Sequence, residues 1–150
     1  MNEHPPAEVS SGVWLIRLPL PFPVATVNAY LIRGREGYLL LDCGLKTRAC
    51  REALSSALAS LGVSWPEIRQ LVLSHIHPDH FGLAAEIQQL SGAEVLMHPV
   101  EAGGMTPDYF DHDFFLSHSA WLLTSGEMPL PSGPVPGNSL LSGMRISEYQ

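Results

Sequence analysis

Short hydrophobic runs recur along the first two thirds of the chain, and turn-forming residues separate them. Three of these runs read as consecutive strands: Val13 to Leu20, Val27 to Gly34 and Gly37 to Gly44. The motif GREG joins the last two runs and is typical of a tight turn, so these strands are expected to form a hairpin. Tyr38 to Leu41 is almost entirely apolar, which indicates a strand covered on both faces.

A helix is predicted from Thr47 to Leu61. Thr47 is a suitable N-cap residue, and Gly62 follows the last turn as a stop signal. Four apolar residues share one side of this helix at helical spacing: Ala49, Leu54, Leu58 and Leu61. The pattern is that of an amphipathic helix.

After this helix the predicted elements alternate. Ser64 to Glu67 has the spacing of a capping box and predicts a short helical turn. Strands are expected at 69–75 and 93–98, with a helix at 82–90 between them. Hairpin strands followed by alternating helices and strands predict an α/β fold, in which helices flank a mixed sheet.

The last third of the chain has a different character. Residues 105–127 carry aromatic and leucine side chains at helical spacing, which predicts a helical insertion that packs as an ordinary helix or lines an apolar pocket. Residues 128–150 begin as a Pro/Gly-rich loop and end in a short hairpin around Gly143. With a polar leader over 1–12, the packed domain is expected to span 13–104.

The segment SHIHPDHFG, Ser74 to Gly82, contains three of the seven histidines of the chain. In an extended segment, side chains two residues apart point to the same side, so His75 and His77 would face one point. Pro78 disfavours a helix through these residues, so they are expected to form a loop that leaves a strand. Gly82 would permit a close backbone approach where the next helix begins.

Asp79 and His80 are expected near the same point. Three imidazoles and a carboxylate suit Zn²⁺, with iron or manganese as alternatives. Structural zinc sites nearly always include cysteine, and none lies nearby, so a catalytic site with an open position is favoured. A metal in such a site lowers the pKa of bound water from about 15.7 towards about 7.

Four ligands within six residues are too crowded for one tetrahedral ion. Two adjacent ions are therefore expected, His75 and His77 on one and Asp79 and His80 on the other. A single histidine at a strand end is commonly a surface or capping residue, and Asp79 alone could cap the next helix. The four residues together, after an apolar strand and before a helix, favour the metal site.

HIHPDH matches the HxHxDH signature of the metallo-β-lactamase-fold hydrolases, and LLLDCG, which contains Asp42, resembles the first motif of that superfamily. The resemblance covers about residues 11–103. It implies the N-terminal half of an αββα sandwich that binds two divalent ions with the ligand pairs given above. It also implies that Asp79 orients the attacking hydroxide, and that Asp42 supports the ligands by hydrogen bonding.

The sequence looks most similar to the glyoxalase II-like and related general hydrolases of this superfamily. These enzymes cleave thioesters, lactones or other esters, so the resemblance implies a metal-dependent hydrolase that uses metal-bound hydroxide. Two alternatives stay open. One is an incomplete, non-catalytic metal-binding domain that acts through a partner, and the other is an iron-dependent enzyme similar to the sulfur dioxygenases.

The remaining ligands of the superfamily come from the second half of its fold and have no counterpart in this sequence. They are a histidine, often in a TPGH-like loop, a bridging aspartate and a last histidine. The other histidines lack that context: His4, His98, His112 and His118. The closing LLSGMRISEYQ resembles the hairpin that precedes the missing loop, so the sequence is expected to stop one strand short of its next ligand. One face of the sheet would then be uncovered, which favours association.

The composition limits the classes of partner and the location that we expect. A formal net charge of −7 argues against nucleic acid, and a small-molecule substrate is expected, with a homo-oligomer left open. The sequence shows no apolar run long enough to span a bilayer, and its N-terminus lacks a signal-peptide pattern, so a cytoplasmic location is expected. Cys43 and Cys50 do not form a disulfide framework and are expected to be small buried side chains in a reducing compartment.

Overall fold

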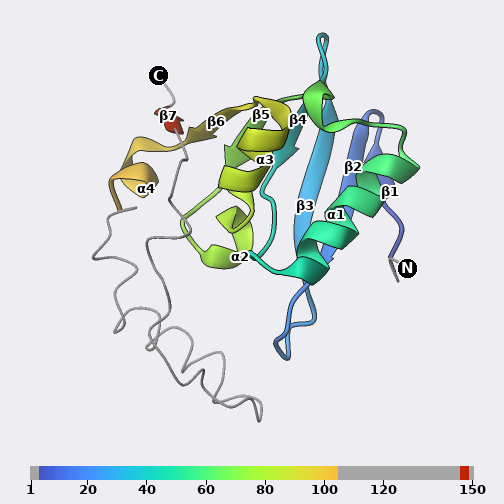
Figure 1. Cartoon of the computed structure of the whole chain (residues 1–150), viewed down its shortest axis with the longest axis horizontal. Helices are drawn as coiled ribbons and strands as arrows, with labels where there is room; N and C mark the ends of the chain where they lie inside the picture. Colours follow the sequence, from blue (N-terminus) through green and yellow to red (C-terminus); the bar gives the residue numbers. More distant parts are fainter. Residues whose placement is uncertain (1–3, 105–145, 149–150) are drawn as a thin grey trace.

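The computed structural model describes residues 4–104 and 146–148, which form a seven-stranded sheet in the order β1-β2-β3-β4-β5-β6-β7 (Figure 1). The strands are β1 (Ala7–Ser10), β2 (Val13–Pro19), β3 (Thr26–Arg33), β4 (Tyr38–Leu41), β5 (Ile68–Leu73), β6 (Glu94–Met97) and β7 (Ile146–Glu148). β1 to β4 pair antiparallel, and β4 to β7 pair parallel. The mixed sheet follows from the chain order, because hairpins come first and helical crossovers follow.

The predicted hairpin is present at β3 and β4. Tyr30 pairs with Leu41 and Arg33 with Tyr38, and the turn closes through a 2.7 Å hydrogen bond from the Gly34 amide to the Gly37 carbonyl. GREG therefore reverses the chain as its composition indicates.

Helices lie over one face of the sheet (Figure 1). They are α1 (Arg48–Ser60), a 3-10 helix (Trp65–Glu67), α2 (Pro78–Phe81), α3 (Ala84–Ser91) and α4 (Pro99–Gly104). The α1 N-cap is as predicted, because the Cys50 amide donates to Thr47 Oγ1 at 3.1 Å. The Ser64–Glu67 capping box is also present.

The buried side of α1 differs by one position from the sequence interpretation. Leu54 and Leu58 are buried as expected, but Ala49 is exposed. The buried residues begin at Cys50 and recur every three or four positions, as the helical repeat requires. Ala49 lies about 100° away from Cys50 around the helix and faces solvent.

The core lies between the sheet and α1 and α3. Its sheet side is formed by buried residues of β2 to β6, which are Trp14, Ile16, Leu18, Val27, Ala29, Leu31, Leu40, Ile68, Leu71, Leu73, Val95 and Met97. Cys43 and Cys50 are buried, free thiols, as predicted. Burial raises the pKa of the Cys43 thiol, so it behaves as an inert core residue.

The opposite face of the sheet carries an apolar row that crosses five strands. Leu15, Tyr30, Leu41, Val72 and Leu96 are successive cross-strand partners along this row. All five side chains are half-buried, whereas their neighbours on the helix-covered face are buried. This face is therefore less well covered than the core face.

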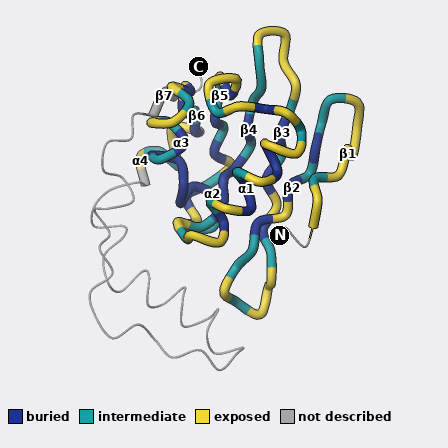
Figure 2. Tube along the Cα trace, turned by 45° about the vertical axis from the view of Figure 1, so that its right-hand side comes forward, coloured by how far each residue is buried: buried dark blue, intermediate teal, exposed yellow. Residues whose placement is uncertain are grey.

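Several boundaries differ from the sequence-based expectation. The polar leader 1–12 contains β1, which is exposed along its length (Figure 2). The helix expected at 82–90 is present as α3, which begins two residues later, at Ala84. A separate helical turn, α2, already begins at Pro78, so Asp79 and His80 lie on a helix and not in the expected loop, because proline is tolerated in the first turn of a helix. The expected strand 37–44 ends at Leu41.

The insertion 105–127 lies outside the described residues, as does most of 128–150, including Gly143. From the closing segment the structure describes β7, which pairs with β6 in parallel. In the part of the chain that is described, no helix is both long and apolar enough to cross a membrane.

Candidate metal site

The candidate site lies where three neighbouring parallel strands end. Asp42 follows β4, the loop from His75 to His80 follows β5, and Glu101 of α4 follows β6. Because parallel strands place their carboxyl ends at the same edge of a sheet, segments distant in sequence meet here. This edge is the usual location of ligand sites in open α/β sheets.

The structure brings the three histidines of the signature together. The ring centroids of His75 and His77 are 4.5 Å apart, and those of His75 and His80 are 4.0 Å apart. His80 Nε2 lies 3.6 Å from Asp79 Oδ2. The convergence predicted from the spacing of these residues is therefore observed, although the chain bends at His75 and Ile76 and is not fully extended there.

Asp42 connects both sides of this cluster by hydrogen bonds. Its Oδ1 accepts from the Ser74 amide at 2.8 Å, and its Oδ2 lies 2.7 Å from both Ser74 Oγ and His80 Nδ1. Asp42 is also the only charged residue among the buried residues of the described chain, with 6% exposure. A buried carboxylate requires such partners, and three hydrogen bonds satisfy it.

The hydrogen-bond network determines where the imidazole protons lie. The carboxylate of Asp42 can only accept, so His80 carries its proton on Nδ1. Ser74 Oγ donates its single proton to Asp42 and must therefore accept from His75 Nδ1, which lies 2.8 Å away. In their neutral forms both rings therefore keep an unprotonated Nε2, the atom through which neutral imidazole binds a metal.

The backbone at Asp42 is unusual. Its φ is +59°, and Asp42 is the one described non-glycine residue with a positive φ. This left-handed conformation ends β4 and turns the chain, and the Cys43 amide then donates to the His80 carbonyl at 2.8 Å. Strain of this kind, about 1–3 kcal/mol, persists only where the surroundings enforce it, and it clusters at functional sites.

Charges in the cluster shift the pKa values in directions that suit a cation. Burial would raise the pKa of Asp42, but hydrogen bonds from His80 and Ser74 outweigh burial and lower it. Burial would lower the pKa of His80, but the hydrogen bond and charge of Asp42 and the charge of Asp79 raise it. The carboxylates around the His80 ring therefore favour a positive charge there, which a proton on Nε2 supplies in the metal-free protein and which a metal ion would replace.

Burial lowers the pKa of His75, and the neighbouring His80 and His77 lower it further. His75 is thereby held in its neutral form, which is the form that a metal binds.

Gly82 allows the helical segment to approach the loop after β4. A Cβ atom at this position would lie 2.4 Å from Lys46 N, 2.6 Å from Pro78 O and 2.8 Å from Gly44 O. All three atoms belong to the backbone and cannot move aside easily. The close approach predicted for Gly82 is confirmed, and it brings His80 within reach of Asp42.

Two residues that the sequence interpretation did not include hold the loop in place. Ser74 joins Asp42 to His75, and Glu101 Oε2 accepts from the Ile76 amide at 3.0 Å. No local pattern marks either residue, since each contact depends on neighbouring strand ends. His98 accepts from the Val100 amide at 3.2 Å and is exposed, so in this structure it caps α4.

The donor atoms of Asp79 and His80 are spaced to bind one divalent cation. Two atoms that bind one tetrahedral zinc ion at about 2.0–2.2 Å lie roughly 3.3–3.6 Å apart, which matches the 3.6 Å between Asp79 Oδ2 and His80 Nε2. Across 4–104 and 146–148, no group of three or more His, Cys, Asp and Glu side chains is arranged to hold a metal ion. Each ion would therefore take a pair of ligands from the signature and the rest from elsewhere.

Comparison with known proteins identifies the family of this chain. Residues 23–149 match the family model described as metallo-beta-lactamase superfamily. A probable metallo-hydrolase of Bacillus subtilis (strain 168), YqjP, is 43% identical over 74 residues, which is 49% of this chain and 23% of that protein.

Two solved structures have a similar fold. A metallo-beta-lactamase family protein from Thermus thermophilus has a TM-score of 0.62 and 32% identity, over 83% of this chain and 41% of that one. A metallo-beta-lactamase from Cronobacter sakazakii with a mutated HARLDQ motif has a TM-score of 0.60 and 26% identity, over 89% and 46%. The chain spans less than half the length of each of these relatives.

Proposed function

The chain belongs to the metallo-β-lactamase superfamily, and we propose that it forms the ligand-bearing part of a dinuclear metal-dependent hydrolase. Such a fold implies binding of divalent metal ions. One observation carries the assignment to these residues. The rings of His75 and His80 converge while Ser74 and Asp42 hold their protons on Nδ1, so that each neutral ring leaves its Nε2 for a metal.

In this proposal His75 and His77 hold the first ion, and Asp79 and His80 hold the second. Bound divalent ions, with zinc as the first choice, supply a polarised carbonyl and a water of lowered pKa. Asp42 fixes the His80 ring from behind. Asp79 is the catalytic residue: its side chain is 30% exposed, so its carboxylate can both bind the ion and orient the attacking water.

We propose an ester, thioester or lactone as substrate and a glyoxalase II-like relationship within the superfamily. The resemblance of HIHPDH and LLLDCG to the corresponding motifs supports this choice, and the B. subtilis relative is itself named a probable metallo-hydrolase. The net charge of −7 supports a small-molecule substrate over nucleic acid.

Metal content and turnover test the proposal. We expect the purified protein to take up about two divalent ions per chain, measured by plasma mass spectrometry after dialysis. His77→Ala and Asp79→Ala should each lower metal content and abolish hydrolysis of ester and thioester substrates. His4→Ala is the matched control, because His4 is exposed and precedes β1. Normal turnover in either site variant would refute the assignment.

A second candidate is a metal-binding domain that acts only with a partner. It is favoured by the lack of a third ligand among the described residues. Metal uptake and hydrolysis measured on the 150-residue chain itself distinguish the enzyme from the partner-dependent domain. Metal uptake with hydrolysis supports the enzyme, whereas metal uptake without hydrolysis supports the partner-dependent domain.

A further inference from the structure

Glu101 lies on α4, outside the signature, and reaches back into it. Its Oε2 accepts a 3.0 Å hydrogen bond from the amide of Ile76, the residue between His75 and His77. Glu101 is half-buried, and α4 is held at its start by the hydrogen bond from the Val100 amide to His98. The glutamate therefore acts on the loop from a third strand end.

The loop needs such a contact because regular structure does not hold it. Ser74 to His77 lies between β5 and α2, and the chain bends at His75 and Ile76. Its amides at Ser74 and Ile76 are held by two carboxylates, those of Asp42 and Glu101. A hydrogen bond to an ionised acceptor is about twice as strong as a neutral one, so these are strong anchors for a bend.

The two anchors flank His75 and precede His77. Fixing the Ser74 amide and the Ile76 amide fixes the backbone on both sides of His75. It thereby sets the direction of the Cα–Cβ bonds that carry the His75 and His77 rings. The T-shaped arrangement of the His75 and His77 rings, at 4.5 Å between centroids, depends on this backbone. Ile76 also contributes a side chain to the core, with 8% exposure, which sets the depth of the loop.

We infer that Glu101 is a positioning residue for the first metal ion, which it serves by holding the His75–His77 ligand pair through the Ile76 amide. The inference rests on the proposed function only in taking His75 and His77 as ligands. Loss of an outer contact that orients metal ligands typically lowers metal affinity about 10–100-fold.

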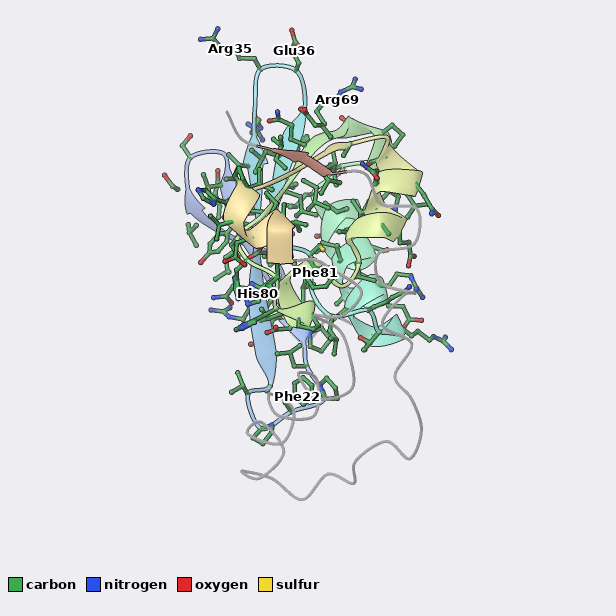
Figure 3. The ribbon with its side chains drawn as sticks, turned by 90° about the vertical axis from the view of Figure 1, so that its left-hand side faces the viewer. Phe22, Arg35, Glu36, Arg69, His80 and Phe81 are labelled. Atoms are coloured by element: carbon green, nitrogen blue, oxygen red, sulfur yellow. The ribbon has the colours of Figure 1, made fainter. Side chains whose placement is uncertain are left out.

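Three substitutions separate this role from general stabilisation. Glu101→Gln keeps the length and an accepting oxygen, Glu101→Asp keeps the charge but shortens the reach, and Glu101→Ala removes both. Glu36→Ala is the control: Glu36 is exposed in the β3–β4 turn, at the end of the molecule opposite to Phe22, with His80 between them (Figure 3). The Arg69 side chain donates a hydrogen bond to the backbone carbonyl of Glu36, and Glu36→Ala leaves that carbonyl in place.

The readouts are cobalt binding, followed by its visible absorption, and hydrogen exchange of the Ile76 amide by NMR in metal-free protein. We expect the Glu36 control to resemble the wild type, and Gln, which keeps only a neutral acceptor, to lie between the wild type and Ala. Asp and Ala should lose about 10–100-fold in affinity for one of the two cobalt ions and should exchange the Ile76 amide faster. If the alanine variant does not fold, the Asp and Gln pair decides the question.

Wild-type affinity and exchange in a folded Asp or Ala variant would overturn the inference. A Gln variant as weak as Ala would also overturn it, because charge rather than the hydrogen bond would then matter. If the wild type binds no cobalt, the proposed function fails. The amide exchange in metal-free protein still decides whether Glu101 holds the loop.

Discussion

Single hydrogen atoms decide whether the histidines of this site can bind metal. Ser74 has one hydroxyl proton and gives it to Asp42, so it accepts from His75 Nδ1. Asp42 likewise fixes His80 as the Nδ1-protonated form. A buried carboxylate and a serine thus fix the Nδ1 proton of both rings, as the proposed metal binding through Nε2 requires.

Ser74→Ala should remove the preference of His75 for the tautomer that is protonated on Nδ1. Without the hydroxyl, Nδ1 loses its acceptor, and His75 should become a mixture of tautomers, visible in ¹⁵N spectra of the imidazole nitrogens of metal-free protein. Affinity for one divalent ion should fall about tenfold. Ser74→Thr keeps the hydroxyl and should resemble the wild type, as should Ser60→Ala, which removes a hydroxyl at the end of α1. An unchanged His75 tautomer in Ser74→Ala would contradict this role.

The sequence indicated the proposed ligands and the supporting Asp42, but not Ser74 or Glu101. His75, His77, Asp79 and His80 are neighbours in sequence, so proline and strand-end geometry were enough to predict that they converge. Ser74 and Glu101 contact these residues only because β4, β5 and β6 end at one edge, which requires the sheet register. The left-handed backbone of Asp42 follows from the same tertiary contacts, since aspartate in isolation has no strong need for it.

At the scale of elements, α1 covers the sheet and joins α3 through Arg51 and Glu86, whose side chains form a two-point ion pair. Local sequence signals were sufficient for α1, since its cap and stop residues are adjacent to it. They failed for β1, whose four residues are all exposed and carry no alternating pattern. An edge strand of this kind exists through backbone pairing with β2.

Thr47→Ala should destabilise the domain by about 1 kcal/mol, because it removes the side chain that accepts from the Cys50 amide at the start of α1. Thr47→Ser retains the acceptor and should restore most of this free energy. Chemical unfolding followed by circular dichroism measures the difference. Equal free energies of unfolding for the Ala and Ser variants would show that the cap is not important for α1.

Gly82→Ala should separate α2 from the loop after β4. The added methyl group meets three backbone atoms closer than 3 Å, so the elements must shift, at a cost of about 1–3 kcal/mol. His80 moves with α2, so metal affinity should fall along with stability. Gly62→Ala is an informative comparison, because its Cβ would meet no atom within 4 Å and only its φ of +70° opposes the change. Gly62→Ala should therefore lower stability without affecting metal affinity. Wild-type metal affinity in Gly82→Ala would contradict the role of this close approach.

At the scale of the whole molecule, the two faces of the sheet are unequal. One face is sealed by α1 and α3, and the other presents the apolar row of half-buried side chains. Apolar surface that is only partly removed from water contributes less to stability and favours association with another apolar surface.

Substitutions at Val72 and Val95 test how differently the two faces of the sheet are covered. They lie on paired strands, Val95 is fully buried on the helix-covered face, and Val72 is half-buried in the apolar row. Val95→Thr places a hydroxyl in the core and should cost about 1–3 kcal/mol. Val72→Thr keeps the β-branched shape and should cost clearly less, because water can reach its hydroxyl.

Urea unfolding of both variants provides the comparison, and sedimentation at several concentrations shows whether Val72→Thr also reduces self-association. We expect the loss in free energy of unfolding to be larger for Val95→Thr, with association weaker in Val72→Thr than in the wild type. Equal losses for the two valines would mean that the apolar row is as well covered in solution as the core. Because threonine and valine have the same shape and both positions are within strands, neither packing volume nor strand propensity could account for a difference between them.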